Sequence, residues 1–197
     1  SPMSRGLGDV YKRQKYVMQD HLIIFLKNPI FKKLQDSKRL DNWARFFELL
    51  EYTSSITSNI KAQRNLYYDE FIENDGVFHD QIFSKKIHTS SNPKQQLKDA
   101  VKESFGQWAK KVVFMGPDSF ELTNSDIELV FSQLDHHQAV ILPAKNSGIL
   151  LFGLTIYRSD IFEHFPWETE DDLLDTIINL QRKQNTYCVL EAKIAYD

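Results

Sequence analysis

An acidic residue, Asp118, follows the short apolar stretch Lys111–Met115 through the tripeptide Gly116-Pro117-Asp118. A stretch of this length and composition is typical of a buried strand. Open α/β sheets bind their ligands just beyond the carboxyl ends of such strands, so Asp118 is a candidate ligand-binding group. The same carboxylate could instead terminate the strand and cap a turn, and the tripeptide alone leaves both interpretations open.

A second group of polar residues follows the apolar stretch His21–Leu26. The next segment, residues 27–40, holds a series of basic side chains: Lys27, Lys32, Lys33, Lys38 and Arg39. A basic rim at the end of a strand could attract an anionic group such as phosphate. It could equally be a solvated surface, and the residues alone do not separate the two.

Other catalytic signatures are missing from the sequence. The six histidines form no H-E-x-x-H or H-x-H arrangement, and there is no Walker loop, G-x-S-x-G or G-x-G-x-x-G motif. The single cysteine, Cys188, lies in the apolar stretch T-Y-C-V-L and is interpreted as an inert strand residue. The sequence therefore argues against a zinc enzyme, a serine hydrolase and a P-loop or Rossmann nucleotide site.

Strands and helices alternate along most of the chain, which predicts an α/β sandwich with helices on both faces of the sheet. The linker Pro143–Gly148 is too short for a parallel crossover, so the strands on either side of it should be antiparallel and the sheet mixed. The predicted strands are His21–Leu26, Asn65–Glu70, Gln81–Ile87, Lys111–Met115, Ala139–Leu142, Ile149–Leu154 and Tyr187–Glu191. Helices are predicted to start at Asp41, Asn92, Thr123 and Thr169, with a short turn from Ser159. Helical spacing predicts that Trp108 lies on the buried stripe of the helix from Asn92, and that Leu174 and Ile178 lie on the buried face of the helix from Thr169.

Composition indicates one ordinary globular domain. The 197 residues are 42% hydrophobic and 26% charged, and no apolar run approaches the ~18 residues of a membrane span. Residues 1–17 show no periodic pattern and lack the apolar core of a secretory signal, so we interpret them as a non-native or disordered extension before a domain of residues 18–197. That domain has 20 basic and 26 acidic residues, a net charge of −6, which disfavours general binding to nucleic acid. The single cysteine is compatible with a reducing compartment, and we expect a cytoplasmic protein.

Four segments occur in the order and at the separations of a known family. They are L-I-I-F-L-K-N-P from Leu22, G-P-D-S-F-E-L from Gly116, P-A-K-N-S-G-I-L-L-F-G-L from Pro143 and W-E-T-E-D-D-L-L from Trp167. Over residues 20–197 the chain resembles the small bacterial glycosyltransferase-A-like proteins (DUF2064 type) described as transferases of radical-SAM and selenoprotein contexts. These belong to the nucleotide-diphospho-sugar transferase superfamily. The resemblance implies a single three-layer sandwich of the GT-A type with a mixed sheet.

The resemblance also implies roles for individual residues. Asp118 would face a nucleotide sugar or its divalent cation, because Mg²⁺ and Mn²⁺ favour carboxylate oxygens. Asp197 would be a further metal ligand, since the family tends to end its last strand with Asp-x-Asp and this chain keeps the second acid. Asn146 stands at a position that would contact the ligand, and Lys27, Lys38 and Arg39 would face its phosphates.

Several positions depart from the family pattern. Lys32 replaces a glycine of the phosphate-facing loop, Asn146 replaces an acid, Ser147 replaces a glycine, and Ile149 and Leu150 replace two tyrosines. An asparagine keeps hydrogen bonding but loses the charge that holds a metal or accepts a proton. Two hypotheses follow: a metal-dependent glycosyl or nucleotidyl transferase with a degraded ligand site, or a catalytically inactive homologue that binds a protein partner of unknown identity.

Overall fold

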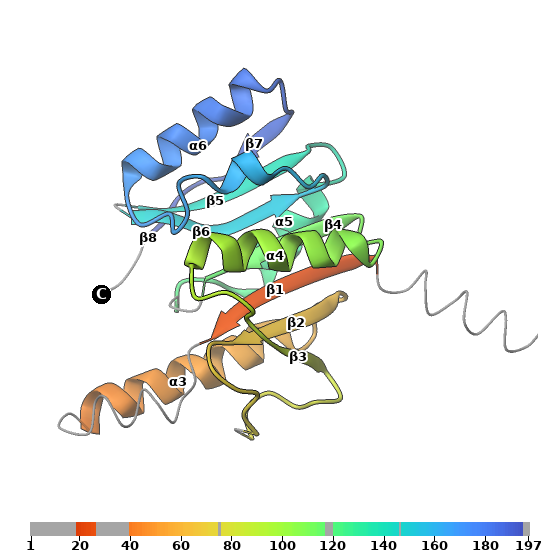
Figure 1. Cartoon of the computed structure of the whole chain (residues 1–197). Coiled ribbons are helices and arrows are strands. Elements are labelled where there is room, and N and C mark those ends of the chain that lie inside the picture. Colours follow the sequence, from red (N-terminus) through yellow and green to blue (C-terminus); the bar gives the residue numbers. More distant parts are fainter. Residues whose placement is uncertain (1–18, 27–39, 75, 117–119, 146, 195–197) are drawn as a thin grey trace, which may run out of the picture.

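The computed structural model describes residues 19–26, 40–74, 76–116, 120–145 and 147–194, and within them the chain forms one sheet (Figure 1). The strands lie in the order β3-β2-β1-β4-β6-β5-β7, and β8 pairs with the end of β5. All neighbouring pairs are parallel except the two that involve β6. The strands are β1 Asp20–Leu26, β2 Gln63–Tyr68, β3 Phe83–Ile87, β4 Lys111–Met115, β5 Ala139–Lys145, β6 Ser147–Leu154, β7 Tyr187–Val189 and β8 Lys193–Ile194.

Helices cover both faces of this sheet. On one face α3 and α5 contribute Leu50, Ile56, Ile127 and Val130 to a buried cluster with the strands. On the other face α4, the short 3₁₀ helix η1 and α6 contribute Leu97, Ile161 and Leu180 to a second cluster. The helices are α3 Leu40–Thr57, α4 Pro93–Gly106, α5 Asn124–Gln133, η1 Ser159–Phe162 and α6 Glu170–Arg182. The predicted three-layer α/β sandwich with a mixed sheet is confirmed.

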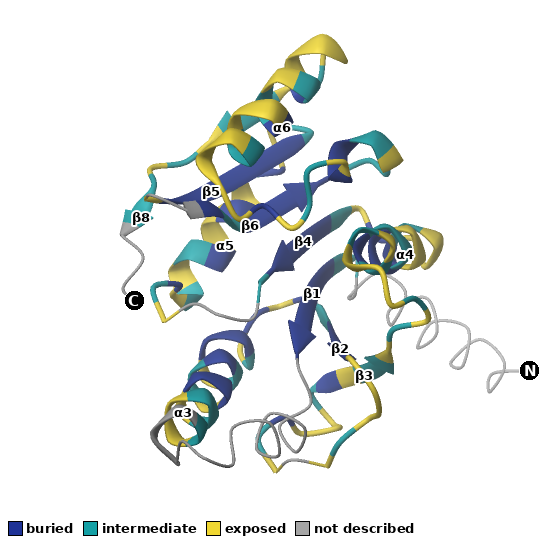
Figure 2. Cartoon of the chain, turned by 60° about the vertical axis from the view of Figure 1, so that its left-hand side comes forward, coloured by how far each residue is buried: buried dark blue, intermediate teal, exposed yellow. Residues whose placement is uncertain are grey.

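The central strands are buried because helices cover them from both sides. Six of the seven residues of β1 are buried, and so are four of the five in β4 (Figure 2). Such strands read as continuous apolar runs rather than as alternating patterns, which is why the sequence revealed them.

Three helix starts follow the predicted capping residues, whereas α3 begins at Leu40, so the predicted cap Asp41 lies inside that helix. Asn92 Oδ1 accepts from the amide of Gln95 at 3.1 Å, with Pro93 in the first turn of α4. Thr123 and Thr169 each form a full capping box, with Asp126 and Asp172 respectively as the reciprocal acid. Each box satisfies amide groups that the first helical turn leaves without partners.

Several expectations about element ends and burial are corrected. The strands around the predicted turn 143–148 are antiparallel as expected, but β5 runs to Lys145 and β6 begins at Ser147. Pro143 is tolerated inside β5 because the register shifts on either side of it, and prolines are found at such irregularities. Trp108, expected on the buried stripe of α4, lies beyond the end of that helix with 82% of its surface exposed.

Three other predicted strands differ at their ends, since β2 runs from Gln63 to Tyr68, β3 begins at Phe83 and β7 stops at Val189; β8 was not predicted. On α6, Leu174 and Ile178 were expected in the core, yet 50% and 42% of their surfaces are exposed. Among the described residues no helix combines the length and the apolar character needed to cross a membrane.

Candidate functional site

The carboxyl ends of the parallel strands β1, β4 and β5 meet at one edge of the sheet, where the sequence places the candidate ligand groups. In the register, Met115 at the end of β4 lies opposite Ile24 of β1 and Leu151 of β6. The predicted site residues themselves lie outside the described residues: Lys27, Lys38, Arg39, Asp118, Asn146 and Asp197.

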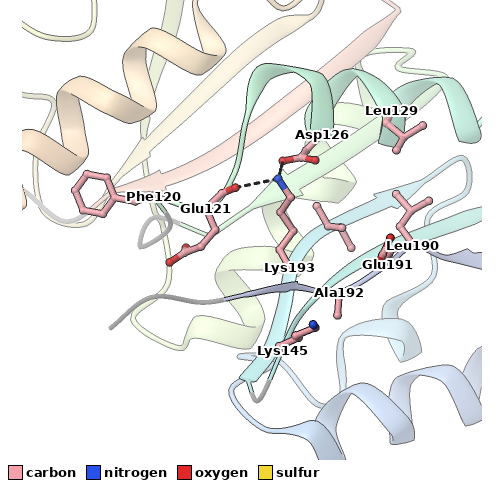
Figure 3. Close-up of a pocket in the computed structure, with 10 residues that line it drawn as sticks. Phe120, Glu121, Asp126, Leu129, Lys145, Leu190, Glu191, Ala192 and Lys193 are labelled. Atoms are coloured by element: carbon pink, nitrogen blue, oxygen red, sulfur yellow. Dashed lines mark hydrogen bonds and ion pairs between the residues drawn. The ribbon is translucent and has the colours of Figure 1, made fainter.

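A cleft of about 780 Å³ opens at this edge, between α5 and the segment that leads into β8 (Figure 3). Its volume falls within the range of small-molecule sites, ~300–1,000 Å³. The lining residues are half apolar and half charged: Phe120, Leu129, Leu142, Leu190, Ala192, Glu121, Asp126, Lys145, Glu191 and Lys193.

The cleft brings together the chain segments that carry three of the predicted residues. Phe120 and Glu121 follow Asp118 closely, Lys145 directly precedes Asn146, and Lys193 lies four residues before Asp197. These segments are far apart in sequence, and only the fold makes them neighbours. Lys145, Glu121 and Lys193 were not singled out from the sequence, because no local pattern marks them.

Lys193 links two walls of the cleft. Its Nζ lies 2.6 Å from Asp126 Oδ2 and donates to the main-chain oxygen of Glu121 at 3.2 Å (Figure 3). Asp126 also accepts from the amide of Thr123 at 2.9 Å, as the acid of the capping box. The ammonium group thus ties β8 to the first turn of α5 and to the segment that leaves β4. Lys145 forms no ion pair with any residue that the structure describes, and its side chain is exposed.

On the opposite face of the same edge, aromatic rings form a wall beneath α4. Phe25, Tyr67 and Phe114 lie near the ends of their strands, and His88 directly follows β3. The His88 ring stacks on Tyr67 with centroids 5.2 Å apart and meets Phe25 edge-on at 4.3 Å. This role of His88 was not predicted from the sequence, although a histidine immediately after a predicted strand is a usable signal.

Burial controls the protonation of this wall. It lowers the pKa of His88 to about 4, so the imidazole is neutral near pH 7. Its Nε2 atom is buried without a hydrogen-bond partner among the described residues. Burial, followed by a hydrogen bond to Glu103, raises the pKa of Tyr67. Burial alone would raise the pKa of Glu103, but hydrogen bonds from Lys86 and Tyr67 lower it overall.

The described residues do not form a metal site by themselves. No group of three or more His, Cys, Asp or Glu side chains within the described ranges could hold a metal ion. In the cleft, the carboxylate of Asp126 is already engaged by Lys193.

The comparisons with known proteins agree with this architecture. A family model described as "Uncharacterized protein conserved in bacteria (DUF2064)" matches residues 54–169, more than half of the chain. A search of curated proteins found no match.

Solved structures share the fold at low sequence identity. A protein of Desulfovibrio desulfuricans G20, provisionally described as a nucleotide-diphospho-sugar transferase, superposes with a TM-score of 0.76 at 18% identity, covering 91% of this chain and 83% of that one. The 4-diphosphocytidyl-2C-methyl-D-erythritol synthase of Anaerococcus prevotii DSM 20548 gives 0.58 at 12% identity, covering 91% and 88%. Rv0371C of Mycobacterium tuberculosis H37Rv, solved with manganese, gives 0.52 at 8% identity, covering 92% of each chain. The fold is thus that of GT-A-like nucleotide-sugar transferases, and by its family match the chain belongs to the DUF2064 family.

Proposed function

We propose that this protein binds a nucleotide sugar, or its nucleotide part, at the carboxyl edge of the sheet. One observation carries the proposal: the cleft there is lined by residues that adjoin Asp118, Asn146 and Asp197 in sequence. The fold supports it, because open α/β sheets bind ligands beyond the carboxyl ends of their strands.

In this proposal Asp118 holds the ligand directly or through Mg²⁺ or Mn²⁺, with Asp197 as a second carboxylate. A divalent ion would neutralise phosphate charge, and one or two carboxylates with the substrate phosphates commonly suffice to hold it. Lys27, Lys38 and Arg39 contact the phosphates, and Asn146 contributes a hydrogen bond without a charge.

We propose further that catalysis in this site is weakened relative to the transferases it resembles. The two positions where the family has tyrosines hold Ile149 and Leu150, which pack against the two hydrophobic clusters on opposite faces of the sheet. These side chains contribute to folding and offer no hydroxyl group to a sugar. If turnover is retained, the activity is that of a metal-dependent glycosyl or nucleotidyl transferase.

Thermal unfolding with UDP-, GDP- and CDP-sugars, with and without Mn²⁺, tests ligand binding. A ligand at about 100 times its Kd stabilises the folded state by about 2.7 kcal/mol. For a chain of this length this corresponds to a rise in Tm of roughly 5–10 °C. We expect a Mn²⁺-dependent rise with one nucleotide class.

Variants assign that shift to the proposed site. Asp118→Ala should abolish it, whereas Asp80→Ala, which removes an exposed carboxylate paired with Lys85 near β3, should leave it unchanged. Asn146→Asp restores the acid that the resemblance implies and should strengthen the Mn²⁺ dependence. The absence of a shift with every nucleotide would favour the second candidate, an inactive homologue that binds a protein partner. The observation that favours this second candidate is that Lys193 and Asp126 in the cleft already neutralise each other.

A further inference from the structure

An apolar pair on α6 faces away from the core. Leu174 and Ile178 are one helical turn apart and leave 50% and 42% of their surfaces exposed, while Thr176 and Leu180 on the inner side are buried. Residues four apart lie on the same side of a helix, so the two exposed side chains form a short continuous stripe.

The position of Gln181 shows where this stripe points. At 100° per residue, Gln181 lies on the same flank of α6 as Leu174 and Ile178. Its amide Nε2 donates to the hydroxyl of Tyr187 in β7 at 2.7 Å. On the opposite flank Asn179 donates to the main-chain oxygen of Asp160 in η1 at 2.7 Å. The stripe therefore lies on the β7 side of the helix, and α6 and β7 are neighbours in Figure 1.

Within the described residues β7 ends the strand order and pairs with β5 alone. Val189 is 39% exposed and shares its face with Tyr187, because side chains alternate along a strand. The other edge strand, β3, carries Lys85 and Lys86, the kind of residue that opposes edge-to-edge association. The segment Tyr187–Val189 contains no such charge.

The stripe ends in opposite charges. Asp171 lies three residues before Leu174 and Arg182 lies four residues after Ile178, on the same flank of α6. Neither side chain forms an ion pair with another described residue. The end charges Asp171 and Arg182 are complementary when a second α6 runs antiparallel, and Asp175 on the same outer side lies 3.9 Å from His164 Nδ1. Asp171 then meets Arg182 of the second copy, and the apolar pairs meet in the middle.

We propose that the α6–β7 surface, formed by Asp171, Leu174, Ile178, Arg182 and Val189, associates two copies of this chain about a two-fold axis. A two-fold interface uses the same patch on both subunits, which a self-complementary stripe satisfies. Antiparallel helices also align their dipoles favourably. With three residues, β7 adds few backbone hydrogen bonds, so the side chains of α6 carry the contact. The patch is small, and a Kd on the order of micromolar is expected.

Sedimentation velocity of the full chain, from about 1 to 300 µM, tests the association. The mass should rise with concentration from 23.1 kDa towards twice that value. Ile178→Glu places a carboxylate in the centre of the patch and should raise Kd at least about tenfold. Ile72→Glu is the matched control: Ile72 is 51% exposed in the loop that follows β2, at the other end of the sheet, and its replacement should leave Kd unchanged.

Charge reversal tests the antiparallel arrangement independently of folding. Asp171→Arg and Arg182→Glu should each raise Kd several-fold, and the two together should restore it, because opposite charges again meet. Circular dichroism should show every variant folded, since these side chains are largely exposed. A chain that stays monomeric at the highest concentration overturns the proposal. So does a dimer that survives Ile178→Glu, or a double reversal that weakens association further.

Discussion

Two residues of the β5–β6 hairpin differ sharply in their surroundings. Gly148 packs directly against the backbone of Trp167, whereas Lys145 borders the open cleft. A Cβ on residue 148 would lie 1.4 Å from the carbonyl oxygen of Trp167 and 2.2 Å from its carbonyl carbon. The amide of Ile149 donates to that same oxygen at 3.2 Å. No flexible side chain could move aside, so this junction requires glycine.

The cleft imposes no such requirement on its lining. Lys193 and Asp126 meet through side-chain atoms, their side chains are 31% and 16% exposed, and truncating either one creates no backbone clash. The lining residues come from separate segments of the chain.

The difference explains which parts of the family pattern this chain keeps. Gly148, Trp167 and Thr169 are retained, and they form the glycine junction, a buried anchor and the cap of α6. Ile149 and Leu150 depart from the pattern, and both suit the core. Packing therefore restricts residue 148 tightly, while Lys145 of the same hairpin borders open space.

Gly148→Ala should show the largest effect. The added methyl group forces the backbone of residues 148 and 167 apart, because the contacting atoms are main-chain atoms. We expect a loss of about 4 kcal/mol or more in the free energy of unfolding, which is exceptional for one substitution. Urea unfolding followed by circular dichroism measures it.

Two other glycines provide controls for that measurement. At Gly153 a Cβ would lie 2.8 Å from Leu134 Cδ1 and 2.9 Å from Val130 Cγ1, the ends of flexible side chains, so Gly153→Ala should cost about 1–3 kcal/mol. Gly106, at the end of α4, has open space around its Cβ position, and Gly106→Ala should change stability by less than about 1 kcal/mol. If Gly148→Ala costs no more than Gly153→Ala, the comparison between junction and cleft is wrong.

The Lys193–Asp126 pair should give a smaller effect, which tests the cleft side of the comparison. Asp126→Ala removes both the capping acid and the partner of Lys193, and should cost about 1–2 kcal/mol. Lys193→Ala should cost less than about 1 kcal/mol, because the pair is partly exposed to solvent. Thermal and urea unfolding of the single and double variants give the coupling between the two residues.

Asp172→Ala is the matched control for Asp126→Ala. Asp172 caps α6 in the same way, accepting from the amides of Thr169 and Glu168, and it has no lysine partner among the described residues. The excess cost at Asp126 therefore measures the ion pair. Equal costs at the two positions, together with zero coupling, would show that Lys193 does not hold the cleft together.

The sequence was sufficient for the fold. The buried strands appeared as apolar runs, Asn92, Thr123 and Thr169 marked the helix starts, and the length of the 143–148 linker identified the antiparallel pair. Errors arose where tertiary structure overrides local preference. Pro143 remains in a strand at an irregular register, and the apolar stripe of α4 stops before Trp108 because the helix ends at Gly106.

The candidate site was harder to predict. A cleft formed by Glu121, Lys145 and Lys193 has no linear signature, because the three residues come from the link between β4 and α5, the end of β5 and the start of β8. The sequence did identify the edge of the sheet where the cleft lies, from one acid after one buried strand. The α6 stripe was misassigned to the core, since helical spacing alone does not tell an inner face from an outer flank.

His88 gives a test with a similarly small expected change in stability, because it lies at the carboxyl edge of the sheet yet is packed among aromatic rings. Burial lowers its pKa in the folded state to about 4, whereas the unfolded chain has the ordinary value near 6.5. Between these values the unfolded state binds more protons, so the stability from this group is complete above pH ~6.5 and is lost as the pH falls towards about 4. His88 is only partly buried, and solvent should reduce the effect to about 1 kcal/mol.

Urea unfolding of the wild type at pH 7.5 and 5 should show this loss of stability. His88→Gln should flatten the pH dependence, and His79→Gln, which replaces an exposed histidine, should not. An unchanged pH dependence in His88→Gln would mean that the His88 ring is solvated like the cleft residues and is not packed like the junction at Gly148.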